Sequence, residues 1–386
     1  MTIHDPELQS VERPLAPPAE TEAGGLLTID LAAIEANWKK LAGMTVPVEC
    51  AAVVKADAYG CGLEPVTRKL AKAGCRTFFV ADLFEARRVR TIAPAATIYV
   101  LNGVMPGSAA AFATGSFRPV INSTTELAEW DTFVRTQKWH GGAALHVDTG
   151  MNRLGIPVEE AVALAPRIQS ENHGISLLIS HLACAEINDH PMNDRQIRTF
   201  RELRILYRGI PSSLANSSGI FLGGTVFCDL VRPGVALYGA NPTPTKQNPM
   251  HPALELKGRI IQVRSANRGD TVGYGAAWTA PRPSRIAIIA IGYADGFLRS
   301  AAAAKYKPPA QVVIAERRCP VVGRVSMDLL AADVTDLGEG VARRGHLATL
   351  VGEGMSVDDL ALGLGTISYE VLTSLGRRFH RVYRGL

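Results

Sequence analysis

The sequence predicts an α/β protein in which an N-terminal (β/α)8 barrel of the TIM type is followed by a mostly β C-terminal domain. The chain has 386 residues, which exceeds the length of one small module. Up to Pro252 short apolar runs alternate with amphipathic segments, whereas strand-like runs separated by Gly, Pro and Asp dominate beyond it. We therefore expect an acidic flexible arm over residues 1–25, the barrel over residues 26–252 and the second domain over residues 253–386.

Composition excludes several classes of protein. Hydrophobic residues make up 47% and charged residues 20% of the chain, as in an ordinary globular protein. The net charge of +5 comes from 41 basic and 36 acidic residues that are scattered, so we expect no nucleic-acid partner. No apolar stretch approaches the roughly 18 to 20 residues of a membrane span, so we expect no membrane partner. The 6 cysteines form no CxxC pair, which predicts neither a disulfide framework nor a metal site and favours the cytoplasm.

The first 25 residues differ from the rest of the chain. They carry acidic residues at positions 5, 7, 12, 20 and 22 against one arginine, together with four prolines. A secretory signal needs a basic start and an apolar middle, and this stretch has neither. It is too polar and too rich in proline to bury itself, so we predict a flexible arm.

The barrel prediction depends on eight candidate strands and the helical segments between them. The candidate strands are Cys50–Val54, Thr77–Val80, Thr97–Leu101, Arg118–Ile121, Ala143–Val147, Leu177–Ser180, a short run near Leu214, and Leu230–Val231. The candidate helices include Glu64–Ala73, Leu83–Ile92, Thr125–Thr136, Val158–Arg167 and Met192–Tyr207. Eight strands with seven crossovers in about 230 residues is typical of a (β/α)8 barrel. A doubly wound sheet is the alternative, although no strand is followed by GxGxxG.

The second domain is predicted from four strand-like runs and two late helical segments. The strands are Leu254–Val263, Arg285–Ile291, Ala310–Ala315 and His346–Val351, and the helical segments are Val357–Leu364 and Ser368–Gly376. The Pro-rich stretch Asn241–Pro252 marks the boundary between the domains.

Lys55 is the sharpest candidate for chemistry. It ends an apolar strand in the segment AAVVKADAYGCG, residues 51–62, and active sites of barrels form where strands end. A lysine that merely reaches the surface would explain the same position. A buried one would be costly unless it were paired or catalytic, so a Schiff-base lysine is the functional interpretation.

Other polar groups fall at the ends of later strands. Arg153 follows the fifth strand, His181 closes the sixth, Asn216 and Ser217 follow the seventh, and Arg232 follows the eighth. Taken singly, His181 could be a hydrogen-bonded core histidine and Ser217 a helix cap. Loops after the last two strands often bind phosphate in barrels. A lysine together with a phosphate site suggests pyridoxal phosphate.

The chain closely resembles the alanine racemases, which are fold-type III pyridoxal-phosphate enzymes, from about Leu26 to Tyr383. The resemblance is carried by nine motifs in family order: AVVKADAYGCG, HVDTGMNRLG, SHLACAE, ANSSG, VRPGVALYG, GYGAAW, IGYADG, GRVSMD and TISYEVLTSLG. It implies interconversion of L-alanine and D-alanine, which supplies D-alanine for peptidoglycan. It also implies a head-to-tail homodimer with shared active sites.

The resemblance implies two catalytic residues. Lys55 would hold pyridoxal 5'-phosphate and serve as the base for the D-isomer, and Tyr274 of the second subunit would serve for the L-isomer. Racemisation removes a proton from one face of Cα and returns one to the other, so two bases on opposite faces suit it. His181 would assist the tyrosine, because phenols ordinarily keep their proton at neutral pH.

The resemblance also implies the binding residues. The contacts on the phosphate side would be Tyr59, Asn216, Ser217, Gly234, Val235 and Tyr369. Arg232 would face the pyridine nitrogen, and Arg153 would hold the phenolate oxygen of the cofactor near the substrate carboxylate. Met327 of the second subunit would contact that carboxylate through its backbone.

One of the departures from the family pattern lies at His146. His146 stands where many relatives carry a lysine that becomes carbamylated and supports the arginine matching Arg153. Histidine cannot be modified in that way, so either His146, an anion or water supports Arg153 here, or Arg153 is held more loosely.

Three alternatives to an alanine racemase remain at this point. A racemase of broader specificity, accepting serine, would normally carry an export signal. A fold-type III decarboxylase would share the barrel and Lys55, but Tyr274 opposite the lysine argues against it. A non-enzymatic cofactor carrier would need only the barrel, whereas this chain has a second domain with Tyr274 and Met327.

Overall fold

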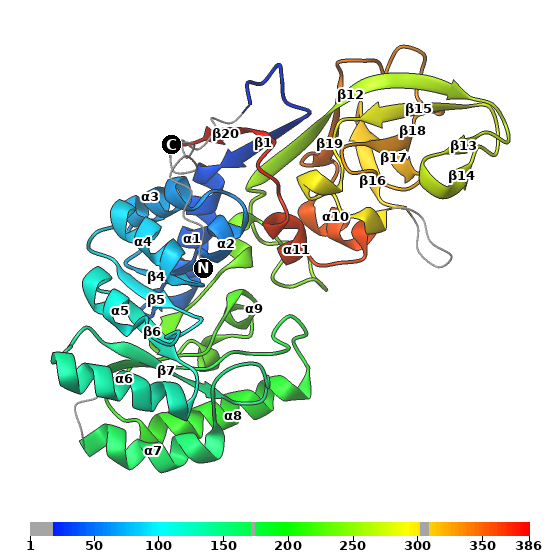
Figure 1. Cartoon of the computed structure of the whole chain (residues 1–386). Helices are drawn as coiled ribbons and strands as arrows, with labels where there is room; N and C mark the ends of the chain where they lie inside the picture. Colours follow the sequence, from blue (N-terminus) through cyan, green and yellow to red (C-terminus); the bar gives the residue numbers. More distant parts are fainter. Residues whose placement is uncertain (1–17, 171–173, 302–308) are drawn as a thin grey trace.

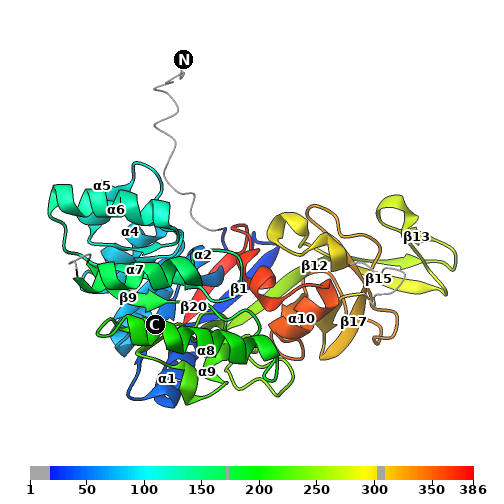
Figure 2. The same cartoon turned by 90° about the horizontal axis from the view of Figure 1, so that it is seen from below.

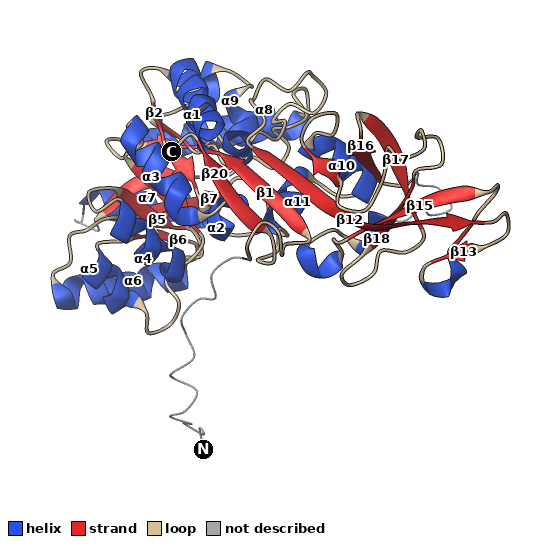
Figure 3. Cartoon of the chain, turned by 90° about the horizontal axis from the view of Figure 1, so that it is seen from above, coloured by secondary structure: helices blue, strands red, loops and turns tan. Residues whose placement is uncertain are grey.

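The computed structural model describes residues 18–170, 174–301 and 309–386. A helix-rich body and a strand-rich body lie side by side, joined by the long strand β12 (Figures 1 and 3). No helix among the described residues is long and apolar enough to cross a membrane.

The first body is a parallel barrel. Seven strands follow one another in the order β10-β9-β7-β6-β5-β4-β3, and β11 pairs in parallel with β2. These strands are β2 (Glu49–Cys50), β3 (Ala52–Val53), β4 (Thr77–Val80), β5 (Thr97–Val100), β6 (Arg118–Ile121), β7 (Ala143–Asp148), β9 (Ile175–Ile179), β10 (Ser212–Ser213) and β11 (Leu230–Val231). The short strand β8 (Ile156–Pro157) pairs with β7.

Two sets of backbone hydrogen bonds close the barrel. The amide of Ala51 donates to the carbonyl of Val231 at 3.0 Å. Ala51 stands between β2 and β3, so these two short strands together form one strand of the barrel, next to β11. The amide of Arg232 donates to the carbonyl of Ala215 at 2.9 Å, which joins β11 to the segment after β10. A doubly wound sheet is open at both edges, so this closure excludes it and confirms the predicted α/β barrel.

Helices surround the barrel strands (Figures 1 and 2). They are α1 (Leu31–Thr45), α3 (Leu63–Ala73), α4 (Leu83–Ile92), α5 (Ala109–Gly115), α6 (Thr124–Gln137), α7 (Val158–Ser170), α8 (Pro191–Leu206) and α9 (Ser217–Ile220). Short polar side chains set where they begin: Asp82 accepts the amide of Glu85, and Ser123 accepts that of Glu126. Gly74 ends α3 with φ 109°, a conformation that glycine adopts without strain.

The second body is built on a sheet with the order β15-β18-β17-β16-β19-β12-β1-β20, in which β15 also pairs with β12. Its strands are β12 (Leu254–Ala266), β15 (Ser284–Ile289), β16 (Gln311–Ile314), β17 (Arg317–Val322), β18 (Leu330–Asp333), β19 (Leu347–Val351) and β20 (His380–Arg384). The hairpin β13 (Thr271–Val272) and β14 (Trp278–Thr279) and the helices α10 (Val357–Leu364) and α11 (Ser368–Thr373) complete it. This composition confirms the predicted mostly β C-terminal domain.

The first strand of the chain belongs to this second sheet. β1 (Gly25–Asp30) pairs antiparallel with β12 and parallel with β20, with Leu27 opposite Leu256. Its side chains alternate between buried and half-buried, and Leu27 and Ile29 are fully buried. Residues from 26 onward were expected to lie in the barrel, but this strand crosses to the other body before α1 begins.

The predicted arm is described only in its last residues. Residues 1–17 lie outside the described residues. Beyond them, the carbonyl of Pro18 lies 2.8 Å from Nδ1 of His380, and the carbonyl of Glu20 accepts a hydrogen bond from Arg259 at 3.0 Å. Residues 18–24 are therefore attached to β20 and β12 and do not extend freely.

Candidate active site

Lys55 lies directly after β3, at the carboxyl end of the barrel strands. Both residues of β3 and the following Val54 are buried, and Val54 donates its amide to the carbonyl of Phe79 on β4. Burial lowers the pKa of the Lys55 amine, and the nearby charge of Arg153 lowers it further. A larger share of the amine is therefore neutral and nucleophilic, as a Schiff-base lysine requires.

The chain leaves Lys55 in a left-handed turn, α2 (Lys55–Tyr59). Ala56, Asp57, Ala58 and Tyr59 have φ angles of 55°, 53°, 54° and 52°. Residues other than glycine adopt this conformation at a cost of roughly 1–2 kcal/mol each, so the rest of the fold must hold the turn in place. Strain of this kind is found mainly at functional sites.

The turn carries Tyr59 to a tight contact with Gly234. The ring of Tyr59 is buried and stacks on that of Tyr238, with 4.7 Å between centroids. A Cβ at position 234 would lie 2.4 Å from the hydroxyl of Tyr59, so only glycine fits there. This close packing fixes the Tyr59 hydroxyl against the backbone of the loop after β11.

Asn216 and Ser217 join the loops after the last two barrel strands. Asn216 begins α9 by accepting the amide of Gly219 at 2.8 Å. The hydroxyl of Ser217 accepts the amides of Gly234 at 2.9 Å and Ala236 at 3.3 Å. The helix cap is therefore Asn216, while Ser217 binds the next loop, where Val235 is buried at the start of the 3-10 helix η3 (Val235–Tyr238).

Arg232 is a buried cation whose guanidinium donates hydrogen bonds to two serine residues. Its Nη1 donates to the hydroxyl of Ser213 and its Nη2 to the carbonyl of Ser180. Burial lowers the pKa of Arg232 to about 10, which leaves it charged at neutral pH. A guanidinium has five N–H groups, so in the described part of the chain it retains donors for a ligand.

Two histidines lie near this cation. Burial is the main reason that the pKa of His181 is far below its ordinary value, followed by the charges of Arg232 and Arg153. Among the described residues the His181 ring has no hydrogen-bond partner. His146 lies with Nδ1 2.7 Å from Oδ1 of Asn122, and burial together with Arg232 lowers its pKa to about 4. Both rings are therefore neutral at neutral pH.

Arg153 is presented by a loop that Asp148 organises. The Asp148 carboxylate accepts the amides of Gly150 at 2.9 Å and of Met151 and Asn152 at 2.8 Å. Arg153 itself is exposed. Its charge lowers the pKa values of Lys55, His146 and His181, which shows that it lies close to all three.

The second domain contributes Tyr369 to the same place. Its ring lies 6.1 Å from that of Tyr59, centroid to centroid, because α11 packs against the turn α2. Arg381 strengthens this contact by donating to the carbonyl of Gly60 at 2.7 Å.

Tyr274 and Met327 are not part of this group within one chain. Tyr274 lies between β13 and β14 with 69% of its surface exposed, and this hairpin is at the far end of the second domain from α2 (Figure 1). Met327 is also exposed, at 54%. The structure therefore brings together the predicted barrel residues and Tyr369 but leaves Tyr274 apart.

Several residues of the site escaped the sequence analysis: Asn122, Asp148, Ser213 and Glu85. Asn122 and Asp148 each directly follow a predicted barrel strand, so their positions indicated a place at the carboxyl end of the barrel. Ser213 and Glu85 gain their roles from Arg232 and Asp57, which are distant in the sequence, and no local pattern indicates them.

Family models match both parts of the chain. The model described as alanine racemase, N-terminal domain, matches residues 29–242, and that described as alanine racemase, C-terminal domain, matches residues 253–383. The chain belongs to the alanine racemase family. This confirms the resemblance that the motifs indicated.

Similar alanine racemases come from several bacteria. The chain is 49% identical over 365 residues to alanine racemase of Methylobacterium sp. (strain 4-46), covering 95% of this chain and 99% of the relative. It is 44% identical to the catabolic alanine racemase of Mesorhizobium japonicum, covering 96% of each. The solved alanine racemase of Bartonella henselae, which contains covalently bound pyridoxal phosphate, has a TM-score of 0.88 at 36% identity, covering 94% of this chain and 99% of that one. The biosynthetic alanine racemase of Pseudomonas aeruginosa has a TM-score of 0.87 at 34% identity, with the same coverage.

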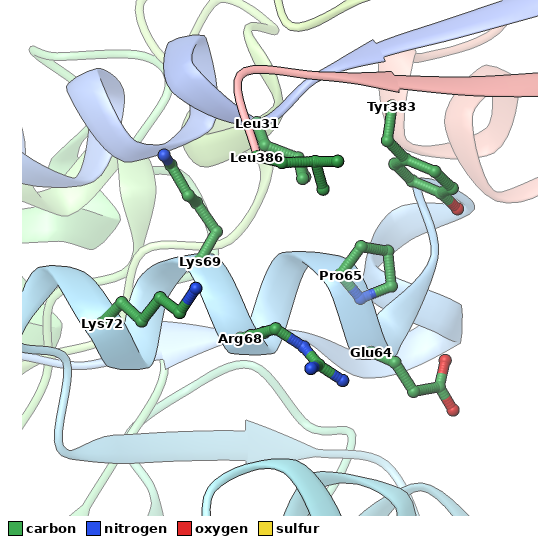
Figure 4. Close-up of a pocket in the computed structure, with 8 residues that line it drawn as sticks. All are labelled: Leu31, Glu64, Pro65, Arg68, Lys69, Lys72, Tyr383 and Leu386. Carbon is green, nitrogen blue, oxygen red and sulfur yellow. The ribbon is translucent and has the colours of Figure 1, made fainter.

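A separate pocket lies outside this alanine racemase site, between α3 and the end of the chain (Figure 4). Its volume is about 270 Å³, and it is lined by Leu31, Glu64, Pro65, Arg68, Lys69, Lys72, Tyr383 and Leu386. None of the predicted site residues lines it, and one of its cations, Lys69, is already paired with Glu35 at 2.9 Å.

Proposed function

We propose that the chain interconverts L-alanine and D-alanine with pyridoxal phosphate and supplies D-alanine for peptidoglycan synthesis. One observation carries the proposal: a chain of this family holds a half-buried lysine of lowered pKa at the carboxyl end of its barrel, where the charge of Arg153 acts on it.

The side chains around Lys55 fit pyridoxal phosphate. The lysine amine suits the covalent link, and the loops after the last two barrel strands, which Ser217 joins through the amide of Gly234, suit the phosphate. The phosphate contacts proposed are Tyr59, Asn216, Ser217, Gly234, Val235 and Tyr369. When bound, the cofactor supplies an electron sink for the charge left on Cα.

Two arginines and a histidine orient the reacting groups. Arg232 would face the ring nitrogen of the bound cofactor with its remaining N–H groups. Because its guanidinium stays protonated, it would donate a hydrogen bond there and give up no proton, which would restrain side reactions. Arg153 would hold the phenolate oxygen of the cofactor near the substrate carboxylate. His181, whose ring has no hydrogen-bond partner among the described residues, would assist the second base.

Two bases act on opposite faces of Cα, one removing a proton and the other delivering its own. In the direction from D- to L-alanine the Lys55 amine takes the proton from one face, and Tyr274 delivers its hydroxyl proton to the opposite face. In the reverse direction Tyr274 takes the proton and Lys55 returns one. Each base therefore ends a turnover in the state that the opposite direction needs.

We propose that the enzyme is a homodimer with shared sites. Tyr274 is exposed and distant from Lys55 of its own chain, so the partner subunit's Tyr274 is the base that faces Lys55. A two-fold arrangement completes both sites with the same contacts. The backbone of the partner subunit's Met327 then contacts the substrate carboxylate.

The cytoplasm is the compartment that we propose for the enzyme. All of its cysteines are described, and all are free. Unpaired thiols suit a reducing compartment.

Chiral analysis of the purified holoenzyme in D2O tests the activity. With L-alanine and L-serine offered separately, we expect deuterated D-alanine to form well ahead of D-serine. Faster turnover of serine would keep the two-base mechanism and change the substrate. A yellow protein that exchanges neither proton would contradict the proposal and favour a decarboxylase or a cofactor carrier.

A further inference from the structure

We propose that Glu85 is a positioning residue for Lys55: its carboxylate holds the left-handed turn after the lysine and places a negative charge beside the amine. The inference rests on the proposed function, because it takes Lys55 to be the lysine that binds the cofactor.

The Glu85 carboxylate connects two backbone segments. Glu85 stands in the first turn of α4 and is 7% exposed. Its Oε1 accepts the amide of Asp57 at 3.1 Å, and its Oε2 accepts the amide of Ala81 at 2.9 Å. Ala81 directly follows β4, so one buried side chain ties the left-handed turn to the neighbouring barrel strand.

The turn needs such a support because its own residues do not favour it. The amide that Glu85 binds belongs to Asp57, which lies in the middle of the four left-handed residues. Without a partner, this half-buried amide loses a hydrogen bond that water replaces only in part. The position of the chain between Lys55 and Tyr59 therefore depends on this carboxylate.

A second support holds the turn from the exposed side. The Asp57 carboxylate accepts the amide of Leu63 at 3.1 Å and a hydrogen bond from Arg88 at 2.7 Å. Arg88 also binds Glu64 through Nε at 2.6 Å and Nη2 at 2.7 Å. Glu85 and Arg88 are three residues apart, so the same face of α4 provides both supports.

The charge of Glu85 acts on Lys55 as well. Burial and Arg153 lower the pKa of the Lys55 amine, while Glu85 raises it. His181 also faces the lysine, because the Lys55 charge contributes to the lowered pKa of that histidine. Among these groups Glu85 is the acid that opposes the lowering of the Lys55 pKa.

The substitution Glu85→Gln removes the charge and keeps the size. A glutamine side chain has one oxygen, so one of the two backbone amides then faces an NH2 group. We expect at least about tenfold weaker binding of pyridoxal phosphate, the ratio that corresponds to one buried donor without a partner. We also expect a change in the pH midpoint at which an amine reagent modifies Lys55, measured by mass spectrometry on the cofactor-free full chain. This midpoint should lie at lower pH in Glu85→Gln than in the wild type.

Glu64→Gln is the matched control, because it removes an acid from the outer support and leaves the backbone contacts of Glu85 intact. We expect this variant to keep the wild-type pH midpoint and cofactor affinity. A residue with a merely structural role would change the unfolding temperature without moving the pH midpoint.

The substitution Glu85→Asp keeps the negative charge and changes only the reach of the side chain. It also replaces Glu85→Gln as the test if that variant does not fold. The shorter side chain keeps the charge but cannot reach both amides, so we expect a midpoint near the wild type and weaker cofactor binding. The proposal is overturned if Glu85→Gln keeps both wild-type values, or if Glu85→Asp binds the cofactor as tightly as the wild type. A wild-type chain without racemase activity would contradict the proposed function but leave the pH midpoints informative.

Discussion

Nδ1 of His146 lies 2.7 Å from Oδ1 of Asn122 at the carboxyl end of β7. The side-chain nitrogen Nδ2 of Asn122 donates to the carbonyls of Leu101 at 3.2 Å and Val120 at 2.8 Å. The side-chain oxygen Oδ1 must therefore face the imidazole ring of His146. His146 therefore donates from Nδ1, and Nε2 of the neutral ring remains an acceptor. Among the described residues, the His146 ring is hydrogen-bonded to Asn122 and not to Arg153.

The lowered pKa of His146 predicts acid sensitivity. The ordinary value of 6.5 falls to about 4 in the folded protein, so between these values the unfolded chain binds the additional proton. The contribution of His146 to the free energy of unfolding is fully present above about pH 6.5. It decreases as the pH falls toward 4, by roughly 3 kcal/mol at most.

The measurement is the unfolding temperature as a function of pH for the wild type and His146→Gln. We expect a shallower dependence in the variant between pH 6.5 and 4, with a remaining slope due partly to His181. Parallel curves would show that His146 does not titrate in this range.

Lys55→Ala should abolish the visible absorbance of covalently bound pyridoxal phosphate. The variant lacks the amine that forms the link, while the phosphate contacts remain. Absorbance spectra before and after dialysis measure this loss. Colour retained after dialysis would mean that another lysine binds the cofactor.

Tyr274→Phe should bind pyridoxal phosphate normally and fail to abstract the α-proton of L-alanine. The substitution removes one hydroxyl from an exposed side chain, so the fold is unaffected. Loss of a general base lowers the rate by about 100- to 10,000-fold. Exchange of the α-proton in D2O, followed by NMR, gives the rate for each isomer; normal exchange of L-alanine would refute the two-base assignment.

Mixing these two variants tests the shared sites. A dimer of one Lys55→Ala chain and one Tyr274→Phe chain has one site with both bases intact. With random pairing, about half of the dimers are mixed, so co-produced variants should regain about a quarter of the wild-type activity. Each variant produced alone is the control. If the mixture stays inactive although mixed dimers are isolated by two affinity tags, both bases come from one chain.

Gly234→Ala should weaken cofactor binding and destabilise the protein by about 1–3 kcal/mol, because the added methyl group meets the Tyr59 hydroxyl. Gly224→Ala is the matched control: nothing lies within 4 Å of a Cβ there, and no positive φ is imposed. Pyridoxal-phosphate affinity and urea unfolding of both variants measure the effect. Equal cofactor affinity and equal stability of Gly234→Ala and Gly224→Ala would show that the protein accommodates the methyl group at position 234 without loss of free energy.

Local patterns in the sequence predicted much of the barrel. The helix predicted over Leu83–Ile92 has the same bounds in the structure, because Asp82 caps its first turn and apolar residues recur on one face. The buried strands β4, β6 and β11 were found from short apolar runs. Lys55, Arg153 and Arg232 were found because polar residues at the ends of buried strands stand out against apolar neighbours.

The sequence by itself therefore determined the order of strands and helices and the polar residues at the ends of the barrel strands. Only the tertiary structure decided that β1 joins β12 and β20, that four residues after Lys55 turn left-handed, and that Tyr274 lies far from Lys55 in one chain. The reason is physical: periodicity and capping act between residues a few positions apart. Strand pairing between residues such as Leu27 and Leu256, and the hydrogen bond from Asp57 to Glu85, act between segments that only folding brings together.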